Sequence, residues 1–354
     1  MIEQNLPMLP PNIDLETKKI LKQLVSAHKY LSELKGYSET IPNKNILINA
    51  IIINESKDSS EIENIITTHD DLYREMSSQS SNNPASKEVE NYRAALWKGF
   101  ELVSKNNILS TNMIVQIQEI VEKNSAGIRK VPGTVLKNDK TGEIVYTPPV
   151  DEDVIREYLK NLEKYINIDD EMDDLIKLAV IHYQFESIHP FYDGNGRTGR
   201  IINVLFLILK GLLDSPILYL SRFIIRNKEV YYRLLQDVRE NKNWEGWILF
   251  ILKGIEEISK ETLELTKLIN NEVILMRDQI KEELPNIYSK ELIEILFKEF
   301  YTKTIFVENG LNVTRKTAVS YLKQLEEKGF LISEKIGKER IYQNKRLFDL
   351  VKNN

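Results

Sequence analysis

The feature that most constrains this chain is a glycine-rich stretch that leads directly into an apolar helix. Residues 189–200 read HPFYDGNGRTGR, and residues 201–213 carry apolar side chains at helical spacing. The turn at residues 194–196 therefore opens a helix. There, successive backbone N–H groups and the positive end of the helix dipole favour an anion. We predict an anion-binding helix N-terminus inside a mainly α fold.

Four side chains around this turn supply groups suited to phosphate chemistry. Arg197 and Arg200 lie three residues apart on one helix face, and two guanidiniums beside an anion site suit a polyphosphate. Asp193 is a hard oxygen ligand suited to Mg²⁺ on the same phosphates. His189 can take a proton from a hydroxyl nucleophile. Each residue alone is more often a satisfied histidine or a surface charge, but together they indicate nucleotidyl or phosphoryl transfer.

Composition excludes other kinds of chemistry. The 354 residues include no cysteine, so disulfides, thiolate catalysis and cysteine-based zinc sites are excluded. The formal net charge of −5 gives no whole-chain argument for nucleic acid or a membrane surface. The N-terminus lacks the pattern of a signal peptide, and no apolar stretch approaches the roughly 20 residues that span a bilayer. We expect a cytoplasmic protein that does not contact a membrane.

The order of elements predicts three regions. Residues 1–100 have helical spacing, with a polar break at 78–85. Residues 101–260 are helical except for 131–147, where strand-forming residues flank a turn and predict a β-hairpin. The third region, residues 285–354, has a different composition.

This C-terminal region has the outline of a winged helix-turn-helix. After a helix at 292–300, residues 304–310 and 314–328 fit helix, turn, helix, with Asn312 or Thr314 as plausible caps. Two short strands, 330–332 and 340–342, are expected to follow. Residues 311–346 contain 9 Lys/Arg and 4 Asp/Glu, a local net charge of +5. The region therefore suits contact with DNA phosphates or with a protein, and we weigh the two equally.

The motif at 189–200 matches the Fic motif at every defined position, and the chain resembles the Fic (Fic/Doc) family over roughly residues 1–260. Further similar stretches are Lys87-Glu88-Val89 with Asn91-Tyr92, Tyr146-Thr147-Pro148-Pro149, and residues 179–186. The resemblance implies a Fic helical core whose hairpin is the flap that holds a segment of a target protein. It also implies that the chain is a protein adenylyltransferase, which moves AMP from ATP to a Ser, Thr or Tyr hydroxyl.

The family's roles carry over residue by residue. His189 would be the general base, and Asp193 would bind the Mg²⁺ between the α- and β-phosphates. Arg197 would hold the phosphates, and Arg200 would pair with the γ-phosphate. The anion hole would be formed by Gly194, Asn195 and Gly196, with the Asn195 side chain adding a donor; Thr198 and Gly199 complete the nucleotide-binding stretch. Tyr232 is similar in position to a nucleotide-site tyrosine, although a Tyr pair is as often core packing.

Gly196 bears on which group is transferred. In Doc-type relatives, which are kinases, this position is lysine. Glycine here implies room for ATP in the orientation that transfers AMP. Transfer of another nucleotide or of phosphocholine, removal of AMP, and a DNA-binding regulator with a Fic sensor core are the alternatives.

Residues 59–64 resemble the inhibitory motif of the family. Ser59 and Glu63 are four residues apart and share a helix face. A carboxylate on that face can pair with Arg200 and take it away from the γ-phosphate. The resemblance is to class II Fic proteins, which are inhibited in cis by an N-terminal helix. Self-modification and a homodimer are further expectations.

Overall fold

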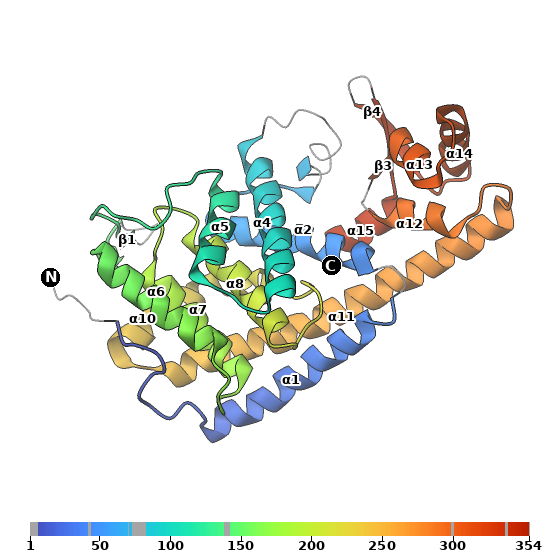
Figure 1. Ribbon diagram of the computed structural model, residues 1–354. Helices are drawn as coiled ribbons and strands as arrows, with labels where there is room; N and C mark the ends of the chain where they lie inside the picture. The colour runs from blue at the N-terminus through green and yellow to red at the C-terminus, as the bar shows by residue number, and fades with distance from the viewer. Residues whose placement is uncertain are drawn as a thin grey trace.

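The protein was analysed as a computed structural model, which describes residues 6–41, 44–69, 71–72, 83–137, 142–298, 301–336 and 339–353. The fold is mainly α-helical, as predicted, with two small β-structures (Figure 1). No helix in these described ranges is both long enough and apolar enough to cross a bilayer.

Two buried helices form the centre of the protein. Helix α7 (Asp174–Ile188) is buried at every position from Leu175 on, and it packs against α8 (Asn195–Leu209). Helix α6 (Glu152–Asn167) covers α7, with its apolar residues confined to one face. Because α7 is buried on every side, His189, which follows its last residue, is held at a fixed position.

A pair of long helices supports this centre. Helix α1 (Lys18–Ser38) lies along α11 (Trp244–Glu283), which runs the length of the molecule and leads to the C-terminal region (Figure 1). Helix α1 begins directly after Thr17, its N-cap, whose side chain accepts a hydrogen bond from the Ile20 N–H. Trp247 joins α11 to α7 by donating from Nε1 to the carbonyl of Ala179, at 2.7 Å.

Three more helices surround the N-terminal end of α8. They are α2 (Lys44–Ile62), α4 (Pro84–Asn106) and α5 (Thr111–Glu122), and each packs against α8. Asn83 and Pro84 start α4 as its N-cap and first residue. The rest of the predicted polar break, at 78–82, lies outside the described residues. The short α9 (Ser221–Arg226) packs against α2, and α10 (Lys228–Asn241) follows it.

The predicted hairpin is present but short. Strand β1 (Leu136–Lys137) pairs antiparallel with β2 (Ile144–Tyr146), and most of the predicted turn lies outside the described residues. The base of the hairpin is held to the core. The hydroxyl of Tyr146 donates to the carbonyl of Ser187 at 2.9 Å, and the Arg239 guanidinium lies 3.8 Å from the centre of the Tyr146 ring.

The C-terminal region contains the predicted helix-turn-helix and hairpin. Thr314 caps the second helix, whereas Asn312 ends the first in a left-handed conformation, so of the two expected caps the Thr314 assignment is correct. Two elements were not predicted: a third strand and a final helix. The elements are α12 (Lys290–Lys298), β3 (Tyr301–Lys303), α13 (Thr304–Leu311), α14 (Arg315–Glu327), β4 (Ile332–Ile336), β5 (Glu339–Gln343) and α15 (Lys345–Asn353), and the strand order is β3-β5-β4.

The final helix returns to the body of the protein. Helix α15 packs against α11 and α2, and the Asn54 side chain of α2 donates to the carbonyl of Val351 at 3.4 Å. One turn earlier on α2, Asn49 donates to the carbonyl of Lys298 in α12, at 2.8 Å. The C-terminal region is therefore in contact with the helix that precedes Glu63.

Candidate active site

His189 lies where α7 ends. It is the C-cap in a left-handed conformation, and its N–H donates to the carbonyl of Phe185 at 3.0 Å. Its ring Nδ1 is buried and makes no hydrogen bond within the described chain. Burial, helped by the charge of Arg129, lowers the pKa of His189 to about 4. The imidazole is therefore neutral near pH 7 and able to accept a proton.

Arg129 fixes the backbone at this point, and sequence reasoning had missed it. Its side chain is almost fully buried, and Nε donates to the carbonyl of His189 at 2.8 Å. Nη2 donates to the carbonyl of Pro149, just after the hairpin. One arginine thus joins the end of α7 to the segment that follows the hairpin.

The glycine-rich turn opens α8 as predicted. Gly194 is the N-cap with φ of +74°, a conformation that favours glycine, and no side chain caps the helix. A helix leaves the N–H groups of its first turn without an intrahelical acceptor, so this end can receive an anion. The Asn195 side chain closes the turn, and its expected role as a donor in the anion hole stays a prediction. Its amide accepts from the Phe191 N–H at 2.9 Å and donates to the Phe191 carbonyl at 2.8 Å.

Arg200 is bound by the segment predicted to be inhibitory. Its Nε donates to the Ser59 hydroxyl at 2.7 Å, and Nη2 donates to the Ser59 carbonyl at 2.9 Å. Nη2 also donates to Glu63 Oε1 at 2.7 Å. Burial disfavours the charged forms of Glu63 and Arg200, but the opposite charge of each residue favours the charged form of the other. The pKa of Glu63 therefore lies below its ordinary value, and the pKa of Arg200 lies above its ordinary value.

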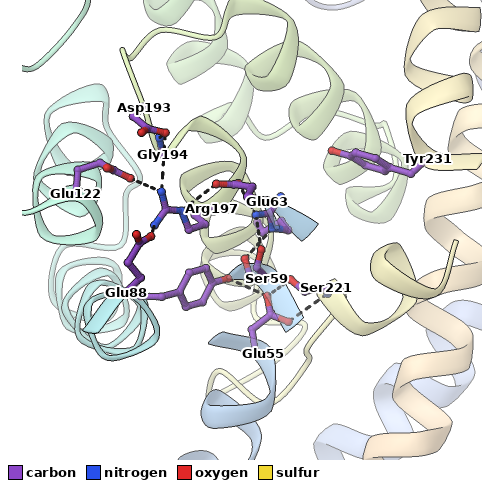
Figure 2. Close-up of polar contacts among 12 residues, drawn as sticks. Glu55, Ser59, Glu63, Glu88, Glu122, Asp193, Gly194, Arg197, Ser221 and Tyr231 are labelled. Carbon is purple, nitrogen blue, oxygen red and sulfur yellow. Dashed lines mark hydrogen bonds and ion pairs between the residues drawn. The ribbon is translucent and has the colours of Figure 1, made fainter. Parts of the chain in front are cut away.

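Arg197 donates hydrogen bonds to three carboxylates from three different segments, and Asp193 Oδ1 lies 3.9 Å from its Nη2 (Figure 2). Nε donates to Glu63 at 3.0 Å, Nη1 to Glu88 of α4, and Nη2 to Glu122 of α5 at 2.6 Å. The Arg197 side chain is only 3% exposed. All three guanidinium nitrogens are therefore bound, and both arginines of the motif are occupied by carboxylates.

Two of these carboxylates also lie directly over the glycines of the turn. A Cβ placed on Gly196 would lie 2.5 Å from Glu63 Oε1, and a Cβ placed on Gly194 would lie 2.4 Å from Glu122 Oε1. Carboxylate oxygens therefore stand against the backbone of both glycines.

Glu55 anchors α2, the helix that carries Ser59 and is followed directly by Glu63. It is buried one turn before Ser59, and it accepts hydrogen bonds from the Tyr92 hydroxyl at 2.8 Å, the Ser221 hydroxyl at 2.5 Å and the Ser221 N–H at 3.1 Å. Figure 2 shows it on the side of Ser59 away from the turn. Burial raises the pKa of Glu55 to about 7.

Asp193 is the exposed carboxylate of the motif. Its side chain is 74% exposed, and Oδ1 accepts from the Gly194 N–H at 2.7 Å. In the described part of the chain, no group of three or more His, Asp or Glu side chains is arranged to hold a metal. A single accessible carboxylate fits Mg²⁺, which is usually held by one or two carboxylates together with substrate phosphates and water.

Thr198 and Gly199 face the protein interior. Thr198 is fully buried, and a Cβ on Gly199 would lie 2.5 Å from Glu186 Oε1 and 3.0 Å from the Phe185 ring. Glycine at 199 therefore allows α8 to approach α7. Glu186 is itself buried, and burial raises its pKa to about 7. The expected contact of Thr198 and Gly199 with nucleotide stays a prediction.

The tyrosine pair on α10 divides between core and surface. Tyr231 is buried, and its hydroxyl lies 3.0 Å from His182 Nε2, away from the carboxylate cluster (Figure 2). Tyr232 is 48% exposed, with its ring edge against Tyr231. The accessible ring at 232 is the one assigned to nucleotide, and that assignment also stays a prediction.

Comparison with known proteins identifies the family. The Fic/DOC family model matches residues 108–207, and the Fic/DOC family N-terminal model matches residues 21–101. The chain belongs to the Fic/DOC family. Residues 274–347 match a third model, described as the C-terminal domain of protein adenylyltransferase SoFic-like proteins.

Curated relatives are similar over part of their length. Probable protein adenylyltransferase aq_aa38 of Aquifex aeolicus is 28% identical over 137 residues, which is 39% of this chain and 39% of the relative. Protein adenylyltransferase fic-1 of Caenorhabditis elegans is 34% identical over 65 residues, 18% of this chain and 13% of the relative. The chain thus matches well under half of each of these two relatives.

Solved structures of Fic proteins share the fold. A Fic family protein from Desulfovibrio desulfuricans G20 has a TM-score of 0.61 at 17% identity, covering 94% of this chain and 98% of that one. Residues 134–508 of Fic-1 from C. elegans have a TM-score of 0.53 at 19% identity, covering 70% of this chain and 73% of that one. The likeness extends beyond the helical core in the first case.

Only some of the residues that contact the Fic motif were predicted from the sequence. Ser59 and Glu63 were expected beside Arg200, and they are there. Glu88 lies in a stretch that had been singled out as similar to the family, but with no role attached. Glu122 carried no signal at all, because a lone glutamate at the end of an amphipathic helix is ordinarily a solvated charge.

Proposed function

We propose that this Fic protein is an adenylyltransferase that transfers AMP from ATP to a hydroxyl of a protein, and that Glu63 inhibits it in cis. The observation that carries the activity is the placement of a neutral His189 next to an uncapped helix N-terminus with two arginines. The printed names of the curated relatives, which are protein adenylyltransferases, support the same reaction.

The chemistry follows from the residues present. A target hydroxyl attacks the α-phosphorus and loses its proton to His189, which acts as general base. A bond forms between the hydroxyl oxygen and the α-phosphorus, and the bond from that phosphorus to the oxygen bridging to the β-phosphate breaks, so pyrophosphate leaves. The N–H groups of the first turn of α8 stabilise the charge on the phosphate oxygens. Mg²⁺ held through Asp193 would neutralise phosphate charge when bound.

Inhibition follows from the contacts of Glu63. It accepts from both Arg200 and Arg197 and lies over Gly196, where a phosphate would otherwise be bound. ATP phosphates must compete with this carboxylate for both arginines, and a charge-assisted pair of this kind is worth more than a neutral hydrogen bond. The resting state is therefore the blocked one.

The test is transfer of label from ATP to protein in the presence of Mg²⁺, with the label on the α-phosphate in one series and on the γ-phosphate in the other. The parent, Glu63→Gly, and Glu63→Gly with His189→Ala are compared, alone and with a cell lysate. We expect α-label to rise with Glu63→Gly and to disappear when His189 is also replaced. Transfer of γ-label alone would mean a kinase, and α-label in the parent equal to that of Glu63→Gly would exclude inhibition by Glu63.

A further inference from the structure

A second carboxylate, Glu122, contacts the motif independently of Glu63. Glu122 is the last residue of α5, and it reaches the motif from the side opposite to α2. Its Oε1 lies 2.6 Å from Arg197 Nη2, and its side chain is 12% exposed. Glu122 therefore comes from a different segment than Glu63: it lies in the region that matches the Fic/DOC family model, and Glu63 lies in the region that matches the N-terminal model.

Glu122 lies beside the N-terminal end of α8. Its Oε1 lies against Gly194, the residue that opens α8, at the end of the helix that favours an anion. It also takes one of the three nitrogens of Arg197. A nucleotide phosphate bound at this end of α8 would need both the space and the arginine.

Removing Glu63 does not remove this obstruction. With Glu63 absent, Arg200 loses its carboxylate, but Arg197 still donates to Glu122 and Glu88. Only Glu122 of these two lies over a glycine of the turn. The site would then be open at Gly196 and closed at Gly194.

The surroundings of Glu122 favour its displacement by a ligand. Besides Arg197, the charged groups near it are Asp193, Glu88 and Glu63. Burial and these three carboxylates raise the pKa of Glu122 to about 7, in spite of Arg197. A carboxylate held by one arginine among three like charges is a weak internal ligand, and it is suited to exchange with a phosphate.

We propose that Glu122 is a second internal ligand of the nucleotide site, which covers Gly194 and holds Arg197 until the phosphates of ATP displace it. It sets the affinity for nucleotide after Glu63 has been released. The proposal rests on the proposed function only in naming ATP as the ligand.

The experiment measures the affinity for ATP by calorimetry, with Mg²⁺ present. This readout is binding, so it does not depend on transfer of AMP to a protein. The background is full-length Glu63→Gly, to which Glu122→Ala or Glu122→Gln is added. We expect Glu122→Ala to bind ATP about tenfold more tightly than Glu63→Gly alone. Glu122→Gln, which keeps the bulk over Gly194 but loses the charge, should fall between the two.

A matched control separates local displacement from general charge. Glu119 lies one turn earlier on α5 and is not among the acidic partners of Arg197. Glu119→Ala in the same background removes the same charge from the same helix and should change ATP affinity less than twofold. Equal gains from Glu119→Ala and Glu122→Ala would overturn the proposal, since they would show a long-range charge effect only.

Two other results are decisive. Weaker or unchanged ATP binding in Glu122→Ala, with an unchanged melting temperature, would mean that Glu122 positions Arg197 and does not block the site. If ATP binds as expected but no variant transfers α-label to protein, the proposed function fails while this inference stands. If Glu122→Ala lowers the melting temperature, Glu122→Gln is the deciding variant. Tighter ATP binding by Glu122→Gln than by Glu63→Gly alone then supports displacement, and equal or weaker binding contradicts it.

Discussion

Charge is handled in opposite ways at the motif and in the C-terminal region. The side chains of Arg197 and Arg200 are each 3% exposed, and carboxylates from other segments bind them. In the C-terminal region, Arg315 and Lys316 of α14 are exposed, and so is Lys323. Exposed charges cost little to leave in water, whereas buried ones must be paired.

This difference indicates which of the two groups of charges requires a functional explanation. Burying two guanidiniums and a carboxylate is expensive, and replacing such groups by apolar side chains is often neutral or stabilising. A stable fold does not require this cluster, so a function explains it better than stability does. The surface charges of α14 allow no such argument, because a solvated basic face needs no further explanation.

The largest expected effect is at the base. In the Glu63→Gly background, His189→Ala should reduce AMP transfer by about 10²–10⁴-fold, since a general base contributes roughly that factor. Initial rates of α-label transfer at saturating ATP measure it. ATP affinity should stay within about threefold, because no contact of Arg197 or Arg200 is changed. A loss of ATP binding equal to the loss of rate would mean that His189 holds nucleotide and does not act as a base.

The second effect tests how tightly α7 and α8 approach each other. Gly199→Ala places a methyl group within 2.5 Å of Glu186 Oε1 and 3.0 Å of the Phe185 ring. Overpacking of this kind costs about 1–3 kcal/mol in the free energy of unfolding. Gly36→Ala in α1 is the matched control, because nothing lies within 4 Å of its added carbon, and it should stabilise by about 0.4–1 kcal/mol. Urea denaturation measures the unfolding free energy of both variants. Equal effects of Gly199→Ala and Gly36→Ala would contradict the close approach of α8 to α7.

Sequence reasoning gave the motif and its partner on α2 because each is a local pattern. A glycine turn before an apolar helix, or a serine and a glutamate four residues apart, can be read within a dozen residues. Glu122, Glu55 and Arg129 have no such pattern. Their roles come from contacts with residues 20 to 166 positions away, such as Arg129 with Pro149 and Glu55 with Ser221, and only packing brings these together.

The same limit explains the errors in the C-terminal region. Helices at 304–311 and 315–327 follow from spacing and from the cap at Thr314. Strand β3 is three residues long, and its pairing with β5 joins residues about forty positions apart. Helix α15 follows β5 after a single residue, Asn344, whose side chain accepts from the Leu347 N–H at 3.2 Å. So short a strand and so close a junction give little periodicity to read.

The third effect is a pH dependence of stability from Glu55. Burial raises its pKa in the folded protein to about 7, above the ordinary glutamate value of 4.5. Between these two values the folded state holds the proton more tightly than the unfolded chain, so stability from this group falls as pH rises across that window. Glu55→Gln should shift the difference in unfolding free energy between pH 5 and pH 8 by about 2 kcal/mol in favour of pH 8. A parent and variant with the same slope would show that Glu55 does not titrate there. Glu122 and Glu186 act in the same direction, whereas the pKa values of His182 and His189, lowered by burial to about 3 and about 4, act in the opposite direction up to about pH 6.5. The difference between the slopes of parent and variant is therefore the quantity that reports on Glu55.

The smallest effect is expected from substitutions of exposed basic residues in the C-terminal region. It is to be compared with the large effect expected for His189→Ala at the motif. Arg315→Ala with Lys316→Ala should change the unfolding free energy by no more than about 0.5 kcal/mol, as surface substitutions usually do. In the Glu63→Gly background the rate of α-label transfer to the chain itself should also be unchanged, because these side chains lie on α14, outside the set of residues that contact the motif. Binding of a random DNA duplex, measured at two salt concentrations, shows whether the two cations contact phosphates. If the pair of substitutions lowers transfer as strongly as His189→Ala does, the contrast fails, and the basic face of α14 belongs to the catalytic machinery.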